Sequence, residues 1–343
     1  MAAFPPASGS SVADSPVSRA RRDVLDNLYA PIADELARVR TRYRELLASD
    51  EPPIANLLAY VEGYSGKMLR PALLLLAAKA CGSVRDEHIT LAVVAEMLHT
   101  ATLVHDDILD DADTRRQRPS INRLAGNETT VLLGDHLFSH ALAIALSIDD
   151  PTGARHFSRA VSRTCSGEIL QVHHHGDLSL SEATYMRIVQ GKTAELYATS
   201  AELGALYAGA GPDAGTGMYR YGLNLGIAFQ IMDDVLDLRG DEATVGKTLG
   251  TDLEGGKATL PIIHAIAARS GTERERFLAL IRRGAVARAA ILADLEESRS
   301  IDYAEQRARE IVSEAKEALA FLGVNHLRAF FGRIADFVIT RQM

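Results

Sequence analysis

Apolar residues recur at spacings of three and four along almost the whole chain from about residue 22, which is the period of an amphipathic helix. The breaks between these stretches are short and carry proline, glycine or aspartate, as at Glu51-Pro52-Pro53 and Asp149-Asp150-Pro151. Neither a strand-like alternation nor an internal repeat is convincing. The pattern predicts helices over residues 24–47, 54–60, 70–81, 90–110, 129–147, 154–175, 181–210, 218–238 and 260–268, and several more from residue 273 onward.

Long helices with short connections predict an all-α fold, a helical bundle that forms one domain over residues 22–343. The connection over residues 241–257 is longer and rich in glycine, and it follows an acidic cluster, so we expect it to act as a lid. Residues 1–21 are rich in Pro, Ser, Ala and Gly and are predicted to be a disordered tail. Their bias toward Arg and Ser also fits a transit signal, but no convincing amphipathic helix is present.

Composition and charge exclude several classes of function. The formal net charge is −8, from 45 acidic and 37 basic residues, and no basic field predicts nucleic-acid binding. No uninterrupted run of eighteen apolar residues is present, so no transmembrane segment is expected. Cys81 and Cys165 lie in apolar helical contexts, which disfavours a disulfide framework and favours a reducing, cytoplasmic compartment.

Two helical segments, residues 106–110 and 233–237, both read D-D-x-x-D within apolar surroundings. Residues four apart share one side of a helix, so Asp106 projects with Asp110, and Asp233 projects with Asp237. So many carboxylates in an apolar setting require cations. A few hard oxygen ligands beside a phosphate suit Mg²⁺, which keeps several of its waters. The sequence therefore predicts a polyphosphate held through Mg²⁺ between two carboxylate-bearing helices.

Basic residues accompany both aspartate segments and are numerous enough for two diphosphate groups. Arginine offers a planar fork to phosphate oxygens, whereas lysine offers a point charge. A histidine two turns before the first aspartate segment is placed to donate to a second diphosphate. The residues concerned are Lys67, Arg70, His99, Arg115, Arg116, Lys192 with Thr193, Lys247 and Lys257.

Together these pieces resemble the trans-type polyprenyl (isoprenyl) diphosphate synthases of the medium- and long-chain type. The resemblance runs from about residue 65 to residue 261. It rests on GKMLRP (66–71), LHTATLVHDDILDDADTRR (98–116), VLLGDHLFS (131–139), GEILQ (167–171), GKTAELY (191–197), GIAFQIMDDVLDLRGD (226–241) and GKTLGTDLEGGKATLP (246–261). The resemblance implies a homodimer with an isoprenoid-synthase helical bundle around a central cavity. It also implies prenyltransferase activity, in which isopentenyl diphosphate is condensed head-to-tail with an allylic diphosphate.

The resemblance further implies a role for each matching residue. Three Mg²⁺ ions, with Mn²⁺ able to substitute, would be bound directly by Asp106, Asp110 and Asp233, with support from Asp107, Asp234 and Asp237. The allylic diphosphate would be bound by Arg115, Lys192, Thr193, Gln230, Lys247 and Lys257. Isopentenyl diphosphate would be bound by Lys67, Arg70, His99 and Arg116.

The same family sets product length by the bulk of the residues just before the first aspartate segment. Here these are Ala101 and Thr102, which are small and would leave a tunnel open for the growing chain. The expected product is an all-trans polyprenyl diphosphate of C30–C50. Phe138, or Met97 and Leu98, would form the floor.

Two other functions were weighed. A class I terpene cyclase shares the fold and the metal chemistry, but its second motif usually reads N/D-x-x-S/T-x-x-x-E and it needs no second diphosphate site. A non-catalytic subunit of a heteromeric synthase usually lacks aspartates that are complete here. The run His173-His174-His175 is expected to be a surface cluster at a helix end, with a phosphate or water contact left open for His174.

Overall fold

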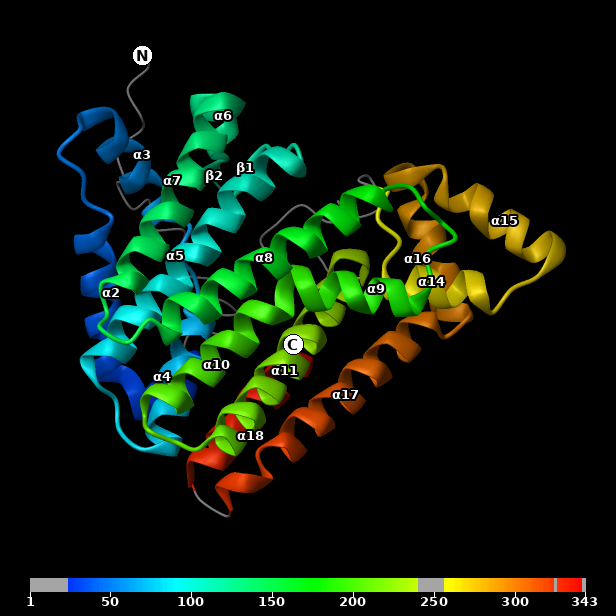
Figure 1. Cartoon of the computed structure of the whole chain (residues 1–343). Helices are drawn as coiled ribbons and strands as arrows, with labels where there is room; N and C mark the ends of the chain where they lie inside the picture. The colour runs from blue at the N-terminus through cyan, green and yellow to red at the C-terminus, as the bar shows by residue number, and fades with distance from the viewer. Residues whose placement is uncertain (1–23, 117, 240–255, 324–325, 341–343) are drawn as a thin grey trace. The chain divides into compact units, whose positions relative to one another are not determined.

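The structure, a computed structural model, describes residues 24–116, 118–239, 256–323 and 326–340. Most of these residues are helical, which confirms the predicted all-α class (Figure 1). They form two compact units, each described by itself below. Unit 1 contains the described residues of Met1–Arg159 and Thr199–Met218, and unit 2 those of Ala160–Ala198 and Tyr219–Met343. The predicted tail, Lys247 and the predicted lid up to residue 255 lie outside the described residues.

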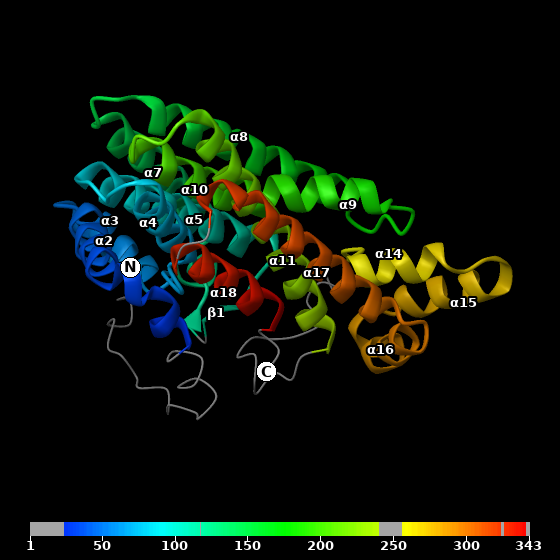
Figure 2. The same ribbon diagram turned by 90° about the horizontal axis from the view of Figure 1, so that it is seen from below.

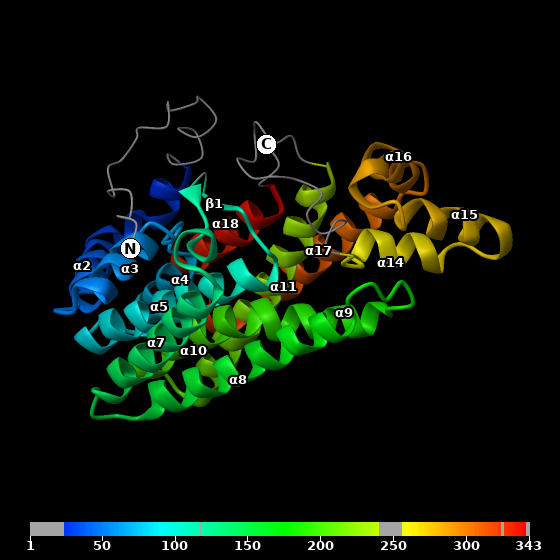
Figure 3. The same ribbon diagram turned by 90° about the horizontal axis from the view of Figure 1, so that it is seen from above.

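Unit 1 is built around one central helix, α5 (Asp86–Leu109), which packs against α2, α4 and α7 (Figures 1 and 3). From Leu91 to Leu98 every side chain of α5 is buried, as expected of a helix covered on all sides. The other elements are η1 (Ala30–Ile32), α2 (Ala33–Leu46), α3 (Pro52–Glu62), α4 (Leu69–Cys81), α6 (Ile121–Ala125), α7 (Asn127–Leu146) and parts of α8 (Thr152–His173), α10 (Glu195–Tyr207) and α11 (Pro212–Arg239).

A short antiparallel hairpin in unit 1 was not predicted. Strands β1 (Thr114–Arg115) and β2 (Arg118–Pro119) pair with Thr114 opposite Pro119 and Arg115 opposite Arg118. Strands of two residues are too short to produce an alternation that sequence reading can detect. The hairpin follows the first aspartate segment directly and carries both arginines of the pair Arg115-Arg116.

Helix α7 is the one helix, within the described ranges, that has the length and composition of a membrane span. One of its faces, which includes Leu133, Leu137 and Ala141, is buried, and α7 packs against α5. Val131, Leu132 and Leu146 remain exposed at 42%, 63% and 64%. One apolar face of α7 is therefore packed inside unit 1, while other apolar side chains of the helix remain exposed.

Unit 2 centres on α17 (Ser300–Ala318), which contacts α14, α16 and α18 (Figure 2). The Tyr221 hydroxyl on α11 donates to the carbonyl of Phe331 on α18 at 2.8 Å. Besides the remaining parts of α8, α10 and α11, the unit contains α9 (Glu182–Val189), η2 (Gln190–Ala194), α14 (Leu260–Ala267), α15 (Gly271–Ile281), η3 (Gly284–Ala287), α16 (Arg288–Glu297), η4 (Ala320–Leu322) and α18 (His326–Thr340).

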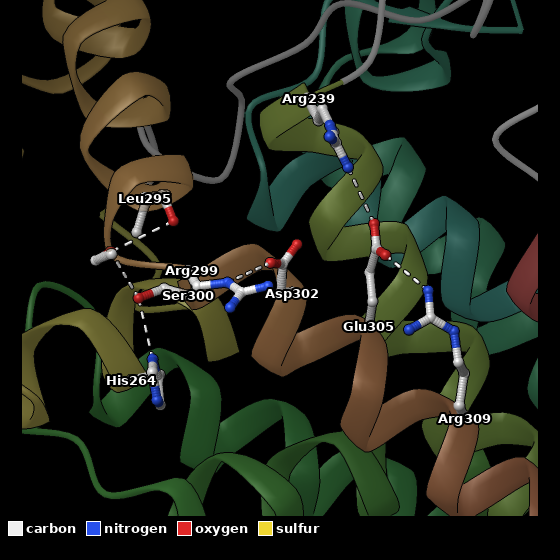
Figure 4. A network of polar contacts seen from close by, with 9 residues as sticks. Arg239, His264, Leu295, Arg299, Ser300, Asp302, Glu305 and Arg309 are labelled. Carbon is white, nitrogen blue, oxygen red and sulfur yellow. Dashed lines mark hydrogen bonds and ion pairs between the residues drawn. The ribbon is translucent and has the colours of Figure 1, made fainter.

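The end of α11, just after the second aspartate segment, is fixed by ionic contacts. Arg239 pairs with Glu305 of α17 at 3.1 Å, and Glu305 also accepts from Arg309 at 2.9 Å (Figure 4). Arg288 donates to the carbonyl of Leu238 at 3.0 Å. A cation at a helix C-terminus and a partner for a terminal carbonyl both stabilise the last turn. These contacts hold the segment that carries the second aspartates.

Candidate active site

The first aspartate segment occupies the C-terminal end of α5. Asp106 is partly exposed, and Asp110, the C-cap residue, is exposed. The backbone N–H of Asp110 still donates to the carbonyl of Asp106 at 2.9 Å, so the two carboxylates are one helical turn apart. The C-terminus of a helix is its negative end, where carboxylates are disfavoured. A divalent cation bound there would offset both the helix dipole and the repulsion between the acids.

The middle aspartate of this segment, Asp107, faces into the protein and is fully buried. Its Oδ1 accepts from Nε of Arg115 at 2.8 Å. Its Oδ2 accepts from the Tyr64 hydroxyl at 2.5 Å and from the backbone N–H of Ile121 at 3.3 Å. Protein donors engage both oxygens, so Asp107 ties α5 to the hairpin, and this geometry agrees with a supporting role rather than direct metal binding.

A buried carboxylate, Glu96, organises the basic residues predicted for isopentenyl diphosphate. Glu96 is 2% exposed and accepts from the Ser65 hydroxyl at 3.1 Å. Burial raises its pKa, an effect that the charge of Arg70 and the Ser65 hydroxyl partly offset. The charge of Arg116 acts on Glu96 in the same direction. The structure therefore brings Arg70 and Arg116 to the same buried acid.

Arg116 covers the start of the GKMLRP segment. Its Nη1 donates to the carbonyl of Ser65 at 2.9 Å. A Cβ at Gly66 would lie 2.0 Å from Nη2 of Arg116, so a larger residue at position 66 would displace the guanidinium. Arg116 and Met68 both adopt left-handed backbone conformations, with φ of 53° and 52°. Such conformations are strained for non-glycine residues and cluster at functional sites.

His99 lies in the field of these arginines. Burial lowers the pKa of His99 well below its ordinary value, and the charges of Arg70 and Arg116 lower it further. The imidazole is therefore neutral at neutral pH, with one N–H to donate and one nitrogen to accept. Lys67 lies in the GKMLRP segment, and its carbonyl accepts from the Tyr29 hydroxyl at 2.7 Å.

The second aspartate segment lies near the end of α11. Asp233 is partly exposed, whereas Asp234 and Asp237 are 6% and 1% exposed. Asp234 accepts from the Tyr185 hydroxyl at 2.6 Å and from Nε2 of Gln230 at 2.8 Å. Oε1 of Gln230 in turn accepts from the Thr193 hydroxyl at 2.8 Å. As in the first segment, the first aspartate is partly exposed and the middle aspartate is buried.

Lys192 and Thr193 lie in a wider turn than the sequence predicted. The pattern predicted one helix over residues 181–210, but Gln190–Ala194 forms a π-helical turn between α9 and α10. A Cβ at Gly167 on α8 would lie 2.4 Å from the backbone nitrogen of Lys192, and one at Gly191 would lie 3.0 Å from the Cα of Gly167. The two backbones touch, and only glycines permit this. π-Turns inside α-helices are frequent at functional sites.

The close approach of α8 to this turn sets the position of the Lys192 side chain. Its Nζ pairs with Oε1 of Glu168 at 2.8 Å, and both side chains are more than four-fifths buried. Nε2 of Gln171 donates to the same Glu168 oxygen at 3.1 Å. Glu168 is thus shared by Gln171, one turn further along α8, and by Lys192 of the π-helical turn. Sequence reasoning gave Glu168 no role, although it lies in the GEILQ segment.

A cavity of about 80 Å³ in unit 2 brings together four of the residues predicted for the allylic diphosphate, and Asp234 also lines it. The four residues are Lys192, Thr193, Gln230 and Lys257. Arg115, the fifth, belongs to unit 1, and Lys247 lies outside the described residues.

The histidine run ends α8 at His173, as expected for a cluster at a helix end. His174 and His175 line the cavity. Hydrogen bonds from Ser179 and from His174 lower the pKa of Asp177 to about 2. The backbone N–H of Gly176 donates to the carbonyl of Gly256 at 3.0 Å. The turn after the histidines therefore supports the residue that precedes Lys257.

The residues predicted to set product length lie in unit 1. Ala101 is fully buried, and the Thr102 hydroxyl donates to the carbonyl of His99 at 2.7 Å. The Phe138 ring lies 5.5 Å from the His105 ring, beside the start of the first aspartate segment. Met97 and Leu98 lie deeper on α5 and are buried. Which of them forms the floor stays a prediction.

Comparison with known proteins places this geometry in a family. The family model for polyprenyl synthetases matches residues 51–297. The chain belongs to the polyprenyl synthetase family. It is 35% identical over 302 residues to the all-trans-nonaprenyl-diphosphate synthase (geranyl-diphosphate specific) of Rhodobacter capsulatus, covering 88% of this chain and 93% of that one. It is 34% identical to the octaprenyl diphosphate synthase of Escherichia coli K12, with the same coverage.

Comparison with solved structures identifies the same family. The polyprenyl synthase of Caulobacter crescentus CB15, crystallised with calcium and isoprenyl diphosphate, superimposes with a TM-score of 0.88 at 35% identity. The match covers 93% of this chain and 98% of that chain. The family resemblance predicted from the sequence is confirmed.

The donor set of this polyprenyl synthetase fits Mg²⁺. Within the described residues, no three His, Cys, Asp or Glu side chains are grouped closely enough to hold a metal by themselves. Mg²⁺ needs no such cage, because it keeps several waters and is bound through one or two carboxylates together with substrate phosphates. The partly exposed Asp106, Asp110 and Asp233 offer carboxylates of this kind.

Proposed function

We propose that this polyprenyl synthetase condenses isopentenyl diphosphate head-to-tail with an allylic diphosphate, releasing diphosphate and an all-trans product five carbons longer. The observation that carries the proposal is that both aspartate motifs have the same organisation. In both motifs the middle aspartate is buried and accepts hydrogen bonds from protein donors, while the first aspartate remains partly exposed. Family membership points to the same activity.

In unit 1, Lys67, Arg70, His99 and Arg116 bind the diphosphate of isopentenyl diphosphate. Arg116 is already held by the Ser65 carbonyl, so less side-chain ordering remains to be done when the anion binds. Neutral His99 donates one N–H to a phosphate oxygen. The product of one round re-enters as the allylic substrate of the next.

The allylic diphosphate is bound by Lys192, Thr193, Gln230, Lys257, Lys247 and Arg115. Asp106, Asp110 and Asp233 would hold up to three Mg²⁺ ions, or Mn²⁺ in their place, while Asp107, Asp234 and Asp237 support them. When bound, these ions stabilise the negative charge that develops on the leaving diphosphate. Lys192, fixed by Glu168, presents a preplaced positive charge to the same group.

The carbocation formed on ionisation requires apolar walls that exclude water. We propose that Ala101 and the methyl group of Thr102 leave this space open. No side-chain nucleophile is required, and the departed diphosphate takes the proton that is lost after condensation. The expected product length is C30–C50, which is supported by the small residues at positions 101 and 102 and by octaprenyl and nonaprenyl synthases among the relatives.

We propose that the enzyme is a cytoplasmic homodimer and that the exposed apolar face of α7 contributes to the interface. Val131, Leu132 and Leu146 form this face, and exposed apolar side chains on one helix are typical of association surfaces. Sedimentation of the purified protein should give twice the mass of the 37.0 kDa chain.

One assay tests the proposed activity. Purified protein is incubated with Mg²⁺, labelled isopentenyl diphosphate and an allylic primer of C5, C10, C15 or C20, and the products are sized by chromatography. The expected result is C30–C50 products that require both substrates and disappear with EDTA. A hydrocarbon formed from an allylic diphosphate alone would instead identify a cyclase. Turnover only after addition of a second polypeptide would identify a subunit of a heteromeric enzyme.

A further inference from the structure

Each aspartate motif has a tyrosine hydroxyl on its middle carboxylate. Tyr64, in the turn after α3, donates to Oδ2 of Asp107 at 2.5 Å. Tyr185, on α9, donates to Oδ2 of Asp234 at 2.6 Å. The two tyrosines come from unrelated segments, one before GKMLRP and one before GKTAELY, and from different units. The same contact has thus been built twice from different parts of the chain.

We infer that Tyr64 and Tyr185 are positioning residues for metal binding. Each keeps the middle aspartate turned into the protein, so that its neighbours on the helix present their carboxylates to the cation. This inference rests on the proposed function, because it assigns the tyrosines to the Mg²⁺ sites of that function. Both hydrogen bonds are short, as is usual when the acceptor is a carboxylate.

In unit 1 the Tyr64 hydroxyl makes two hydrogen bonds. It donates to Asp107 and also accepts from the backbone N–H of Ile121 at 2.9 Å. The other oxygen of Asp107 holds Arg115 at 2.8 Å. Without the hydroxyl, Oδ2 keeps the more distant N–H of Ile121 at 3.3 Å. Asp107 is then able to turn toward a cation beside Asp106, and Arg115 loses its fixed partner.

In unit 2 the Tyr185 hydroxyl supports a chain of hydrogen bonds. Asp234 accepts from Tyr185 on one oxygen and from Gln230 on the other, and Gln230 accepts from Thr193. Rotation of Asp234 would therefore displace Gln230 and Thr193 as well as the carboxylates of α11. Some residues hydrogen-bond to metal ligands without touching the ion themselves. Removing such a residue typically lowers metal affinity or activity by about 10- to 100-fold.

The test is the Mg²⁺ dependence of Tyr64→Phe and Tyr185→Phe. Phenylalanine keeps the ring and removes one oxygen, so both variants should fold. At saturating substrates, the Mg²⁺ concentration for half-maximal turnover should rise about 10-fold or more in each variant. Without turnover, the Mg²⁺ concentration at which inorganic diphosphate gives half of its increase in melting temperature should rise by the same factor. Matched controls are Tyr43→Phe, which loses a hydroxyl bond to Thr100 at 2.8 Å, and Tyr221→Phe, which loses one to the Phe331 carbonyl at 2.8 Å. Both controls should keep the wild-type Mg²⁺ dependence even where the melting temperature falls.

A double-mutant cycle shows whether Tyr64 acts through Asp107. Asp107→Asn and the double variant Tyr64→Phe/Asp107→Asn should have the same Mg²⁺ midpoint, because the tyrosine has lost the carboxylate through which it acts. If Tyr64→Phe does not fold, Tyr185→Phe with its Tyr221→Phe control carries the test. The inference would be overturned if the Mg²⁺ midpoint of the double variant exceeded that of Asp107→Asn by the full factor seen between Tyr64→Phe and wild type.

The remaining outcomes separate the inference from the proposed function. Wild-type protein that shows no Mg²⁺-dependent prenyl transfer would refute the proposed function. Wild-type protein that is active, with Mg²⁺ midpoints in Tyr64→Phe and Tyr185→Phe no different from those of the Tyr43→Phe and Tyr221→Phe controls, would refute the positioning role alone.

Discussion

The contact between Gly167 and the π-helical turn predicts a large effect from one added methyl group. In Gly167→Ala, the new Cβ would lie 2.4 Å from the backbone nitrogen of Lys192 and 2.8 Å from the carbonyl carbon of Gly191. Real Cβ contacts are essentially never shorter than 3.0 Å, so the two backbones must separate by at least about 0.6 Å. Neither neighbour is the end of a flexible side chain, so the strain cannot be relieved by a rotamer change.

The change in stability of Gly167→Ala is the sum of two opposed effects. Overpacking of this kind destabilises by about 1–3 kcal/mol. Alanine in a helix interior is more favourable than glycine by about 1 kcal/mol. The expected net loss is about 0–2 kcal/mol, or a fall in melting temperature of up to about 3 °C for a chain of this length. Catalysis should suffer more, because a displacement approaching 1 Å in a positioned group lowers turnover by about 10- to 100-fold.

Gly332→Ala is the matched control, since Gly332 lies within α18 of the same unit and a Cβ there meets no atom within 4 Å. This variant should gain up to about 1 kcal/mol of stability and keep full turnover. Thermal unfolding and steady-state kinetics measure both quantities on both proteins. If Gly167→Ala were as stable and as active as Gly332→Ala, the backbone contact would not be what positions Lys192.

Three further predictions concern single side chains. Glu168→Gln should lower kcat about 10-fold with a smaller change in the KM of isopentenyl diphosphate, because Lys192 loses the charge that fixes it; an unchanged kcat would mean that Lys192 needs no partner. The pKa of His99 in the folded protein lies below its value in the unfolded chain, which is about 6.5. Between these two pKa values the unfolded chain binds more protons than the folded protein. The free energy of unfolding therefore falls as pH falls, by at most about 1.4 kcal/mol per pH unit. Urea unfolding of His99→Gln at pH 5.5 and 7.5 should show a smaller pH effect than wild type, and an equal effect would exclude His99 as its source. Ala101→Phe should shorten the product in the chromatographic assay, and an unchanged length would place the floor elsewhere.

The helices could be predicted because periodicity reports which face of each segment is buried, and α5 and α11 carry the aspartates where that pattern placed them. The candidate ligands could be predicted because their residue types and spacing are unusual. Partners distant in sequence could not. Tyr64 lies 43 residues before Asp107, and Tyr185 lies 49 residues before Asp234. Nothing in the local pattern links them.

Two local features were also missed, for a different reason. The π-helical turn keeps the apolar period of its neighbours, so the sequence reads as one helix through residue 193. It lies where two glycines on separate segments, Gly167 and Gly191, come into backbone contact, and a local pattern does not report such a contact. Glu96 was missed because a single acid within an apolar helix resembles ordinary variation, although it lies one turn before His99. That the two aspartate rows act on the same substrate stays a prediction from family resemblance.

A π-helical turn holds one residue more than the α-helix around it needs. Shortening the chain by one residue within Gln190–Ala194 would let an uninterrupted ladder form from α9 into α10. The same shortening would close the bulge that brings Gly191 against Gly167 and Lys192 to Glu168. A one-codon deletion at this turn would therefore give a more regular helix that lacks the contacts by which Lys192 is placed.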